Sequence, residues 1–174
     1  VQCEDEIAGC ASSIGASFAG ALAVTSTSGP GVCLKSEAMN LAVITELPLV
    51  ILNVQRGGPS TGLPTKSEQT DLLQALFGRN GESPMPVIAA TSPTNCFDAA
   101  YYASKMALEH MTPVVLLTDA FVANGSGAFK LPDLNDYPDI CPPYVTPEMA
   151  GSYTPYMRKP DTQVRYWAIP GQEG

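Results

Sequence analysis

The chain has 174 residues, enough for one domain with a sizeable core, and 45% of them are apolar. Nine basic residues against 17 acidic ones give a net charge of −8, which argues against binding to a nucleic-acid backbone or to an anionic membrane surface. Charged residues make up only 15% of the chain, which is low for a soluble domain. A surface with so few charges is better explained by burial in an oligomer interface than by a monomer.

Cysteine and histidine usage limits the metal chemistry of the chain. The five cysteines are scattered without a Cys-x-x-Cys pair, and His110 is the single histidine. We therefore expect free thiols, no metal site in this chain and a cytoplasmic location. No apolar run reaches the roughly 20 residues of a membrane-spanning helix, and no secretory signal is visible.

The first predicted elements alternate between helix and strand. Residues 4–20 are rich in Gly, Ala and Ser, begin with acids, and predict a tightly packed helix. Residues 21–28 are a β-branched run that predicts a strand ending at a Gly-Pro-Gly turn. Residues 32–46 have helical apolar spacing. Residues 48–54 are continuously apolar, which is typical of a strand buried on both faces in a parallel sheet.

Residues 55–70 interrupt this alternation with Gly, Pro, Ser and Thr and no periodicity. A connection this long is usually functional or disordered. The alternation then resumes with a short helix at 71–78, a strand at 86–92, a helix at 95–111 capped by Ser92 or Thr94, and a strand at 113–119. Strands separated by helices predict an α/β fold with a doubly wound, mostly parallel sheet, which binds ligands at the carboxyl ends of its strands.

The remainder of the chain has a different composition. Eight of the 16 prolines lie between Pro132 and Pro170, which predicts an irregular, extended arm and not a second globular domain. We accordingly divide the chain into an α/β domain at 1–125 and a Pro-rich arm or linker at 126–174 leading toward a following domain. Because the sequence has no initiator Met and opens inside a predicted helix, we expect it to be a piece of a longer protein.

Three short motifs offer chemistry, each with a plain alternative. Ser28-Gly29-Pro30-Gly31 exposes backbone amides near a helix N-terminus, where an anion or a flat ring can approach, but a simple tight turn explains it equally well. The acids at 4–6 fit a solvated helix cap. A helix as small and apolar as 7–23 should nevertheless be buried, and a buried carboxylate must be paired or protonated. One of these acids is therefore a candidate functional group.

The third motif, Gln55-Arg56-Gly57-Gly58, sets an arginine at the end of a buried strand beside two glycines. A guanidinium there suits a carboxylate or phosphate ligand, whereas the alternative is a structural ion pair with Asp71 or Asp119. His110, near the end of a predicted helix, is interpreted as a structural or capping residue.

Two longer motifs carry a family resemblance. QRGGPSTGLPTKSEQTDL (55–72), together with EDEIAGCASSIGASFAGALAVTSTSGPG (4–31), resembles the alpha subunits of the 2-oxoacid:ferredoxin oxidoreductases, which use thiamine diphosphate. The likeness runs over residues 4–125, continues weakly through RYWAIPG (165–171), and covers the domain that holds the pyrimidine ring of the cofactor. It implies oxidative decarboxylation of a 2-oxoacid with coenzyme A in anaerobic metabolism, giving an acyl-CoA, carbon dioxide and reduced ferredoxin.

The resemblance also assigns the cofactor contacts. Glu6 matches the family glutamate that hydrogen-bonds N1′ of the aminopyrimidine and thereby activates the cofactor. Glu4 and Asp5 are the alternatives if the register slips. The turn of Thr27, Ser28 and Gly29 is expected to lie beside the pyrimidine ring and to offer backbone contacts.

The substrate contacts follow from the same resemblance. Arg56 is similar to the family arginine that receives the carboxylate of the 2-oxoacid, and Thr65 to a residue near that substrate. Lys66 is expected to reach the distal carboxylate of a dicarboxylic substrate. The loop is most similar to that of 2-oxoglutarate enzymes, for which the acyl product is succinyl-CoA.

The remaining parts of the enzyme are expected outside this chain. The resemblance implies a beta subunit that binds the diphosphate with Mg²⁺ and carries a [4Fe-4S] cluster, hence a homo- or hetero-oligomer that reduces ferredoxin. Two alternatives remain: an enzyme of the same family that takes an aryl or branched-chain 2-oxoacid, and a non-catalytic binding or scaffold module. Retention of Glu6, Arg56 and the whole 55–72 motif argues against the scaffold module.

Overall fold

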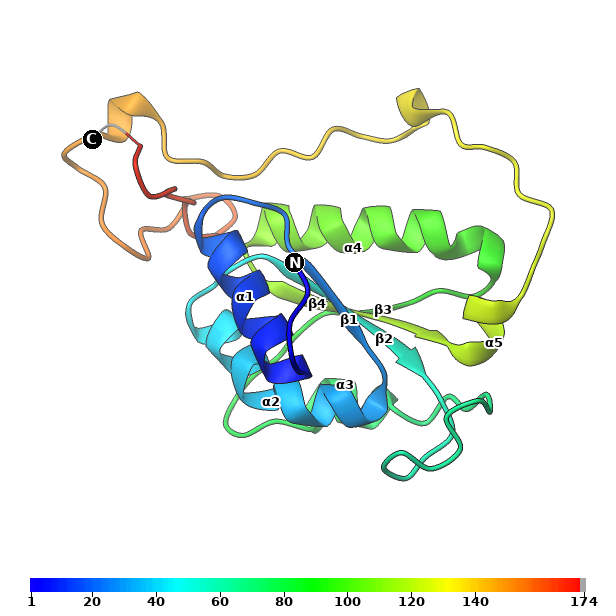
Figure 1. Cartoon of the computed structure of the whole chain (residues 1–174). Helices are drawn as coiled ribbons and strands as arrows, with labels where there is room; N and C mark the ends of the chain where they lie inside the picture. The colour runs from blue at the N-terminus through cyan, green and yellow to red at the C-terminus, as the bar shows by residue number, and fades with distance from the viewer. Residues whose placement is uncertain (173–174) are drawn as a thin grey trace.

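The computed structural model describes residues 1–172, in which four parallel strands lie between helices (Figure 1). The strands follow one another along the sheet in the order β1-β2-β4-β3. Their bounds are Val24–Thr27 for β1, Leu49–Gln55 for β2, Val87–Ala89 for β3 and Pro113–Asp119 for β4. All neighbours in this order pair in parallel, which confirms the doubly wound α/β architecture expected from the sequence.

The two central strands are the most apolar segments of the chain. All seven residues of β4 are buried, and β2 pairs with it from Leu49 opposite Pro113 to Gln55 opposite Asp119. Burial on both faces explains why each strand reads as a continuous apolar run. Because the register aligns the two carboxyl ends, the segments that follow Gln55 and Asp119 leave the sheet side by side.

Helices cover both faces of the sheet (Figure 1). Since successive strand residues point to opposite faces, Leu49, Ile51, Val115 and Leu117 pack in one core, and Val50, Val114 and Leu116 pack in the other. The first core lies under α1 (Glu6–Phe18), α2 (Gly29–Ile44) and α3 (Leu72–Phe77), and the second under α4 (Cys96–His110). A short helix α5 (Ala120–Asn124) follows β4.

Several boundaries differ from those predicted. The first strand begins at Val24 and not at residue 21, because the chain first turns at Gly20, whose φ is 91°. The second helix begins three residues early, at Gly29, because a proline fits the first turn of a helix. Strand 86–92 shortens to three residues at the edge of the sheet. Helix α5 was not predicted.

Residues 126–172 are largely irregular, as expected, and this segment crosses over α4 before it turns back (Figure 1). Its described helical turns are η2 (Leu134–Asp136) and η3 (Pro147–Met149). The returning chain buries Trp167 and Val164 against Leu108 and Met111, at the end of α4. The arm is therefore packed onto the domain at its far end.

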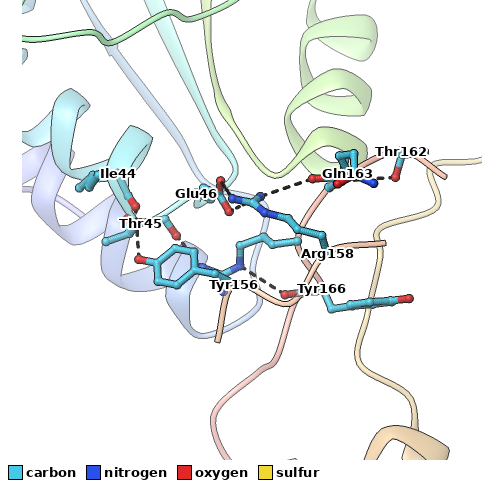
Figure 2. A network of polar contacts seen from close by, with 10 residues as sticks. Ile44, Thr45, Glu46, Tyr156, Arg158, Thr162, Gln163 and Tyr166 are labelled. Carbon is cyan, nitrogen blue, oxygen red and sulfur yellow. Dashed lines mark hydrogen bonds and ion pairs between the residues drawn. The ribbon is translucent and has the colours of Figure 1, made fainter. Parts of the chain in front are cut away.

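The returning arm also fastens the carboxyl end of α2 (Figure 2). The guanidinium of Arg158 binds both carboxylate oxygens of Glu46, at 2.6 and 2.8 Å. Tyr156 donates its hydroxyl hydrogen bond to the carbonyl of Ile44 at 3.2 Å, and Arg165 donates to the carbonyl of Thr45 at 2.6 Å. Donors at these carbonyls satisfy the unpaired end of the helix. We call Tyr156, Arg158 and Arg165 the arm clasp.

Candidate active site

A cavity of about 490 Å³ opens at the carboxyl ends of β1, β2 and β4. This edge of a parallel sheet is where ligands bind in doubly wound folds. The cavity brings together Glu6, the Thr27–Ser28 pair and Arg56, which belong to three separate segments of the sequence. Its lining also includes Ser26, Val54, Pro64, Ala120 and Asn124.

Glu6 reaches this cavity because Asp5 takes the capping position of α1. The Asp5 carboxylate accepts a hydrogen bond from the amide of Ala8 at 2.8 Å, which leaves Glu6 as the first helical residue. Glu6 is half-buried, whereas Glu4 and Asp5 are exposed. The expected burial of the whole helix is wrong for this chain, because α1 turns only one face, with Cys10, Ile14 and Ser17, toward the core.

A glycine in α2 allows the close approach of the elements around Glu6. A Cβ on Gly31 would lie 1.8 Å from Oγ1 of Thr27 and 2.8 Å from Cγ of Glu6. Contacts that short leave no room for a side chain, so the first turn of α2 lies directly against both residues. The Ser-Gly-Pro-Gly motif therefore joins β1 to α2 and also brings the backbone of α2 into contact with Glu6.

Within residues 1–172, Arg56 at the end of β2 has no ion-pair partner. Asp71 accepts a hydrogen bond from Asn53 at 3.0 Å, and Asp119 accepts one from Gln69 at 2.7 Å. The alternative that Arg56 pairs with either aspartate is therefore wrong. The Nε of Arg56 is buried with no hydrogen-bond partner in the described residues. A cation with an unsatisfied donor at a cavity wall is available to an anionic ligand.

Unsatisfied polar atoms gather at this edge of the sheet. In residues 1–172, buried side-chain atoms without a partner are Asn53 Oδ1, Arg56 Nε, Thr118 Oγ1 and Trp167 Nε1. The first three lie at the carboxyl ends of β2 and β4, whereas Trp167 lies in the arm. Leaving such atoms unpaired destabilises a fold by about 1–3 kcal/mol each. Of these three residues Arg56 lines the cavity, where its Nε is available to a polar ligand.

The loop at 55–70 is held by specific hydrogen bonds. The amide of Gly57 donates to the carbonyl of Lys66 at 2.8 Å, and that of Leu63 donates to the carbonyl of Gly57 at 3.0 Å. The carboxylate of Glu68 accepts from the amide of Gly58 at 2.8 Å. A loop fixed in this way is ordered, which favours the functional interpretation of its composition over disorder.

Not all predicted residues meet in the cavity. The side chains of Thr65 and Lys66 are exposed and do not line it. Gly29 lines a neighbouring hollow of about 490 Å³, which shares Arg56 with the first cavity and includes Asp71. Arg56 thus separates two hollows, with Glu6 on one side and Gly29 on the other. His110 is exposed in the last turn of α4.

Sequence reasoning missed two residues near the site. Lys35 of α2 is 1% exposed, and its signal in the sequence was the single cation of that helix, four positions after Gly31. Asn124 ends α5, a helix too short to leave a periodic pattern. Within the described residues no cluster of three or more His, Cys, Asp or Glu side chains suits a metal, and no helix is long and apolar enough to cross a membrane.

Comparison with known proteins gives consistent relatives. The chain is 54% identical over 99% of its length to the 2-oxoglutarate oxidoreductase subunit KorA of Mycobacterium tuberculosis, and covers 26% of that protein. It is 46% identical over 78% of its length to the 2-oxoglutarate synthase subunit KorA of Archaeoglobus fulgidus, and covers 39% of it.

A solved structure is also similar. The 2-oxoglutarate:ferredoxin oxidoreductase of Magnetococcus marinus, with 2-oxoglutarate, coenzyme A and succinyl-CoA bound, matches with a TM-score of 0.88 and 38% identity. The match covers 98% of this chain and 29% of that one. Residues 1–168 match the family described as pyruvate flavodoxin/ferredoxin oxidoreductase, thiamine diphosphate-binding. The resemblance seen in the two motifs is thereby confirmed, and the chain belongs to the thiamine diphosphate-binding domain family of the pyruvate flavodoxin/ferredoxin oxidoreductases.

Proposed function

We propose that this chain is the pyrimidine-binding part of a 2-oxoglutarate:ferredoxin oxidoreductase. That enzyme converts 2-oxoglutarate and coenzyme A to succinyl-CoA and carbon dioxide and passes the electrons to ferredoxin. The observation that carries the proposal is the cavity shared by Glu6 and Arg56, in which an acid and a cation without an ion-pair partner in the described part of the chain face one ligand space. The names of the relatives in Mycobacterium tuberculosis and Archaeoglobus fulgidus support the choice of substrate.

The residues around Glu6 fit the pyrimidine half of the cofactor. Thiamine diphosphate, when bound, supplies the carbon nucleophile that attacks the 2-oxoacid and takes up the electrons released by decarboxylation. Glu6 holds a proton at N1′ of the aminopyrimidine, and its half-buried position strengthens that hydrogen bond. Thr27, Ser28 and Gly29 offer backbone groups beside the ring, where Gly31 leaves no side chain in the way.

Arg56 binds the carboxylate of the 2-oxoacid. A guanidinium donates two parallel hydrogen bonds to a carboxylate and so fixes its orientation, which a lysine cannot reproduce. The unpaired Nε supports this role, since a bound carboxylate satisfies it. Thr65 and Lys66, exposed on the hydrogen-bonded loop, contribute to the distal end of the substrate, where a second carboxylate distinguishes 2-oxoglutarate from monocarboxylic 2-oxoacids.

A partner subunit completes the site. We assign the diphosphate contacts, Mg²⁺ and the [4Fe-4S] cluster to a beta subunit, and the electron acceptor is ferredoxin. Exposed apolar side chains on α1, β1 and α2 supply a surface for further protein contacts: Phe18 (57%), Val24 (55%) and Ile44 (71%). All five cysteines are free thiols, which is consistent with the cytoplasmic location expected from the sequence.

A substrate panel on the assembled oxidoreductase tests this function. Purified complex is assayed anaerobically with coenzyme A and a ferredoxin or viologen acceptor, and 2-oxoglutarate is compared with pyruvate, an aryl and a branched-chain 2-oxoacid. We expect the highest kcat/KM for 2-oxoglutarate. A preference for another 2-oxoacid would assign the chain to a sister activity, and no turnover with any substrate in a cofactor-loaded complex would favour a scaffold module.

A further inference from the structure

One aspartate is bonded to the strand end from which Arg56 extends. Asp71 immediately precedes α3, and its amide donates to Oε1 of Gln55, the residue before Arg56, at 3.0 Å. The carboxylate of Asp71 accepts from Nδ2 of Asn53 at 3.0 Å. Asn53 and Gln55 lie two positions apart on β2 and therefore point to the same face of the sheet. Both the backbone and the side chain of Asp71 are thus fixed to the carboxyl end of β2.

The same carboxylate lies against the first residue of α2. A Cβ on Gly29 would lie 2.9 Å from Oδ2 and 3.4 Å from Oδ1 of Asp71, so the carboxylate comes this close because residue 29 has no side chain. Within residues 1–172 the side chain of Ser28, which precedes α2, makes no capping hydrogen bond. Negative charge near a helix N-terminus is stabilising. Asp71 therefore supplies from another segment a charge that the first turn of α2 lacks.

The carboxylate of Asp71 is not used to cap the helix that it precedes. An aspartate in this position usually accepts a hydrogen bond from an amide two or three residues further on. In the described part of the chain the Asp71 side chain makes no such bond to α3. It is half-buried and lines the hollow that also contains Gly29 and Arg56. A carboxylate that contacts two other elements in place of its own helix indicates a role in tertiary structure.

We propose that Asp71 is a positioning residue that fixes the distance between Arg56 and the turn at 27–29. The proposal rests on the proposed function, in which Arg56 binds the 2-oxoacid and the turn lies beside the pyrimidine ring. Asn53 lies opposite Thr27 in the register of β2 and β1, so its hydrogen bond also fixes Asp71 relative to the turn. Substrate and cofactor must meet in a defined geometry, and a displacement of about 1 Å can slow a reaction about 100-fold.

Two substitutions separate the hydrogen bond of Asp71 from its size. Asp71→Leu is close in size and removes the acceptor for Asn53, whereas Asp71→Asn keeps an oxygen that can accept the same bond. Both variants keep the bond to Gln55, because the donor is the backbone amide of residue 71. Asp133→Leu is the matched control, since it removes an exposed aspartate whose carboxylate accepts from the amide of Asn135 in the arm, at 2.9 Å.

The first measurement needs no cofactor. Amide hydrogen exchange of the cofactor-free complex is followed by mass spectrometry of peptides that cover 29–34 and 56–70. We expect both peptides to exchange about tenfold faster in Asp71→Leu, because the start of α2 and the loop lose their shared contact. Asp71→Asn and Asp133→Leu should exchange as wild type does. Wild-type exchange of both peptides in a folded Asp71→Leu complex would overturn the proposal.

The second measurement compares two steps in the complex loaded with thiamine diphosphate and Mg²⁺. Proton exchange at C2 of the thiazolium, read by NMR, involves no substrate, whereas single-turnover release of labelled carbon dioxide from saturating 2-oxoglutarate requires substrate and cofactor to be aligned. We expect Asp71→Leu to slow carbon dioxide release about 10- to 100-fold and to leave C2 exchange within about threefold of wild type. Asp71→Asn should restore the release rate, and Asp133→Leu should change neither step.

The two steps also distinguish this proposal from the proposed function. If Asp71→Leu slows both steps equally, or slows neither, the positioning role is wrong even though the wild-type complex decarboxylates 2-oxoglutarate. If the loaded wild-type complex releases no carbon dioxide from any 2-oxoacid, the proposed function is wrong. In that case faster amide exchange in Asp71→Leu still supports the shared contact of loop and turn, and unchanged exchange overturns it.

Discussion

Gln69 donates a hydrogen bond to Asp119, from Nε2 to Oδ2 at 2.7 Å, across 50 positions of sequence. The other oxygen of the same carboxylate accepts from the amides of Phe121 and Val122, at 2.7 and 3.1 Å. A single buried carboxylate therefore caps α5 and fastens the 55–70 loop to the end of β4. Both elements border the active-site cavity, so the shape of the cavity depends on this contact.

Asp119 should make stability depend on pH. Burial raises its pKa, but the hydrogen bonds from Gln69 and the two amides offset that effect, and the pKa lies below its ordinary value. The stabilisation is therefore present above the ordinary aspartate pKa of about 3.9 and lost as pH falls through the folded-state value. At pH 7 we expect Asp119→Asn to lower the free energy of unfolding by about 1–2 kcal/mol. Denaturant titrations should show that the difference in free energy of unfolding between wild type and Asp119→Asn becomes smaller as pH falls below about 4. A difference that does not change with pH, or an equal difference for the exposed control Asp139→Asn, would contradict this prediction.

Glu6→Gln tests the proposed proton chemistry directly. Glutamine keeps the size of the side chain and the capping of α1 by Asp5, so the complex should fold with an unchanged melting temperature. It cannot exchange a proton with N1′, and general acid–base groups of this kind contribute about 100- to 10,000-fold. Proton exchange at the thiazolium C2, followed by NMR, should slow by about that factor. An unchanged rate would move the role to Glu4 or Asp5, for which Glu4→Gln and Asp5→Asn are the companion variants.

Lys66→Met tests whether the 55–70 loop binds the second carboxylate of the substrate. Lys66 is exposed, and its backbone carbonyl, not its side chain, holds the loop, so the variant should fold normally. If its ammonium contacts the distal carboxylate, KM for 2-oxoglutarate should rise about tenfold, corresponding to roughly 1.4 kcal/mol. KM for pyruvate, which lacks that group, should not change. Equal effects on both substrates would reject a role in selectivity, and Lys130→Met serves as the exposed-lysine control.

The sequence predicted the sheet and helices well because the periodic patterns are strong and local. The segment PVVLLTD, for example, is buried along its whole length as β4, so its environment agrees with the strand that its continuous apolar run predicts. The strand order and the short helix α5 were not predictable, since neither follows from periodicity. The sequence placed Thr27, Ser28 and Arg56 near strand ends and Glu6 at the start of a helix, but only the packing of α1, β1 and β2 against one another gathers them around one cavity.

The parts of the site that escaped prediction depend on tertiary packing. In the sequence Lys35 is indistinguishable from an exposed helix lysine, because its burial results from the packing of α1 on α2. The partners of Asp71 and Asp119 are likewise set by contacts distant in sequence: Asn53 and Gln69 donate to the two carboxylates that were the alternative partners for Arg56. The resemblance assigned a role to Arg56, whereas only the structure indicates that its Nε has no hydrogen-bond partner among residues 1–172.

The arm should contribute to stability through Trp167 much more than through the arm clasp. Trp167 is fully buried, packs against Leu108 and stacks on Tyr144 with ring centroids 5.3 Å apart. Trp167→Ala is expected to lower the free energy of unfolding by about 3–5 kcal/mol. Arg158→Ala breaks an ion pair whose arginine is 43% exposed, so its effect should stay below about 1 kcal/mol. Denaturant unfolding of both variants checks this, and comparable losses would mean that the clasp, not the aromatic packing, holds the arm.

Arg56 is expected to act on the substrate and not on the cofactor. It follows a buried strand and precedes Gly57 and Gly58, so its guanidinium is held at the cavity wall with Nε unpaired. Loss of one partner of a buried charge pair typically weakens binding by about 2–5 kcal/mol. Arg56→Lys should therefore raise KM for the 2-oxoacid about tenfold or more, and Arg56→Ala should lower kcat/KM about 100-fold or more. Affinity for thiamine diphosphate, measured by titration of the complex, should change little. The control variant Arg158→Lys should leave KM, kcat/KM and the cofactor affinity unaltered. An unchanged KM together with a collapse of cofactor affinity would make Arg56 a cofactor ligand, and the carboxylate would then need another cation along the same edge of the sheet.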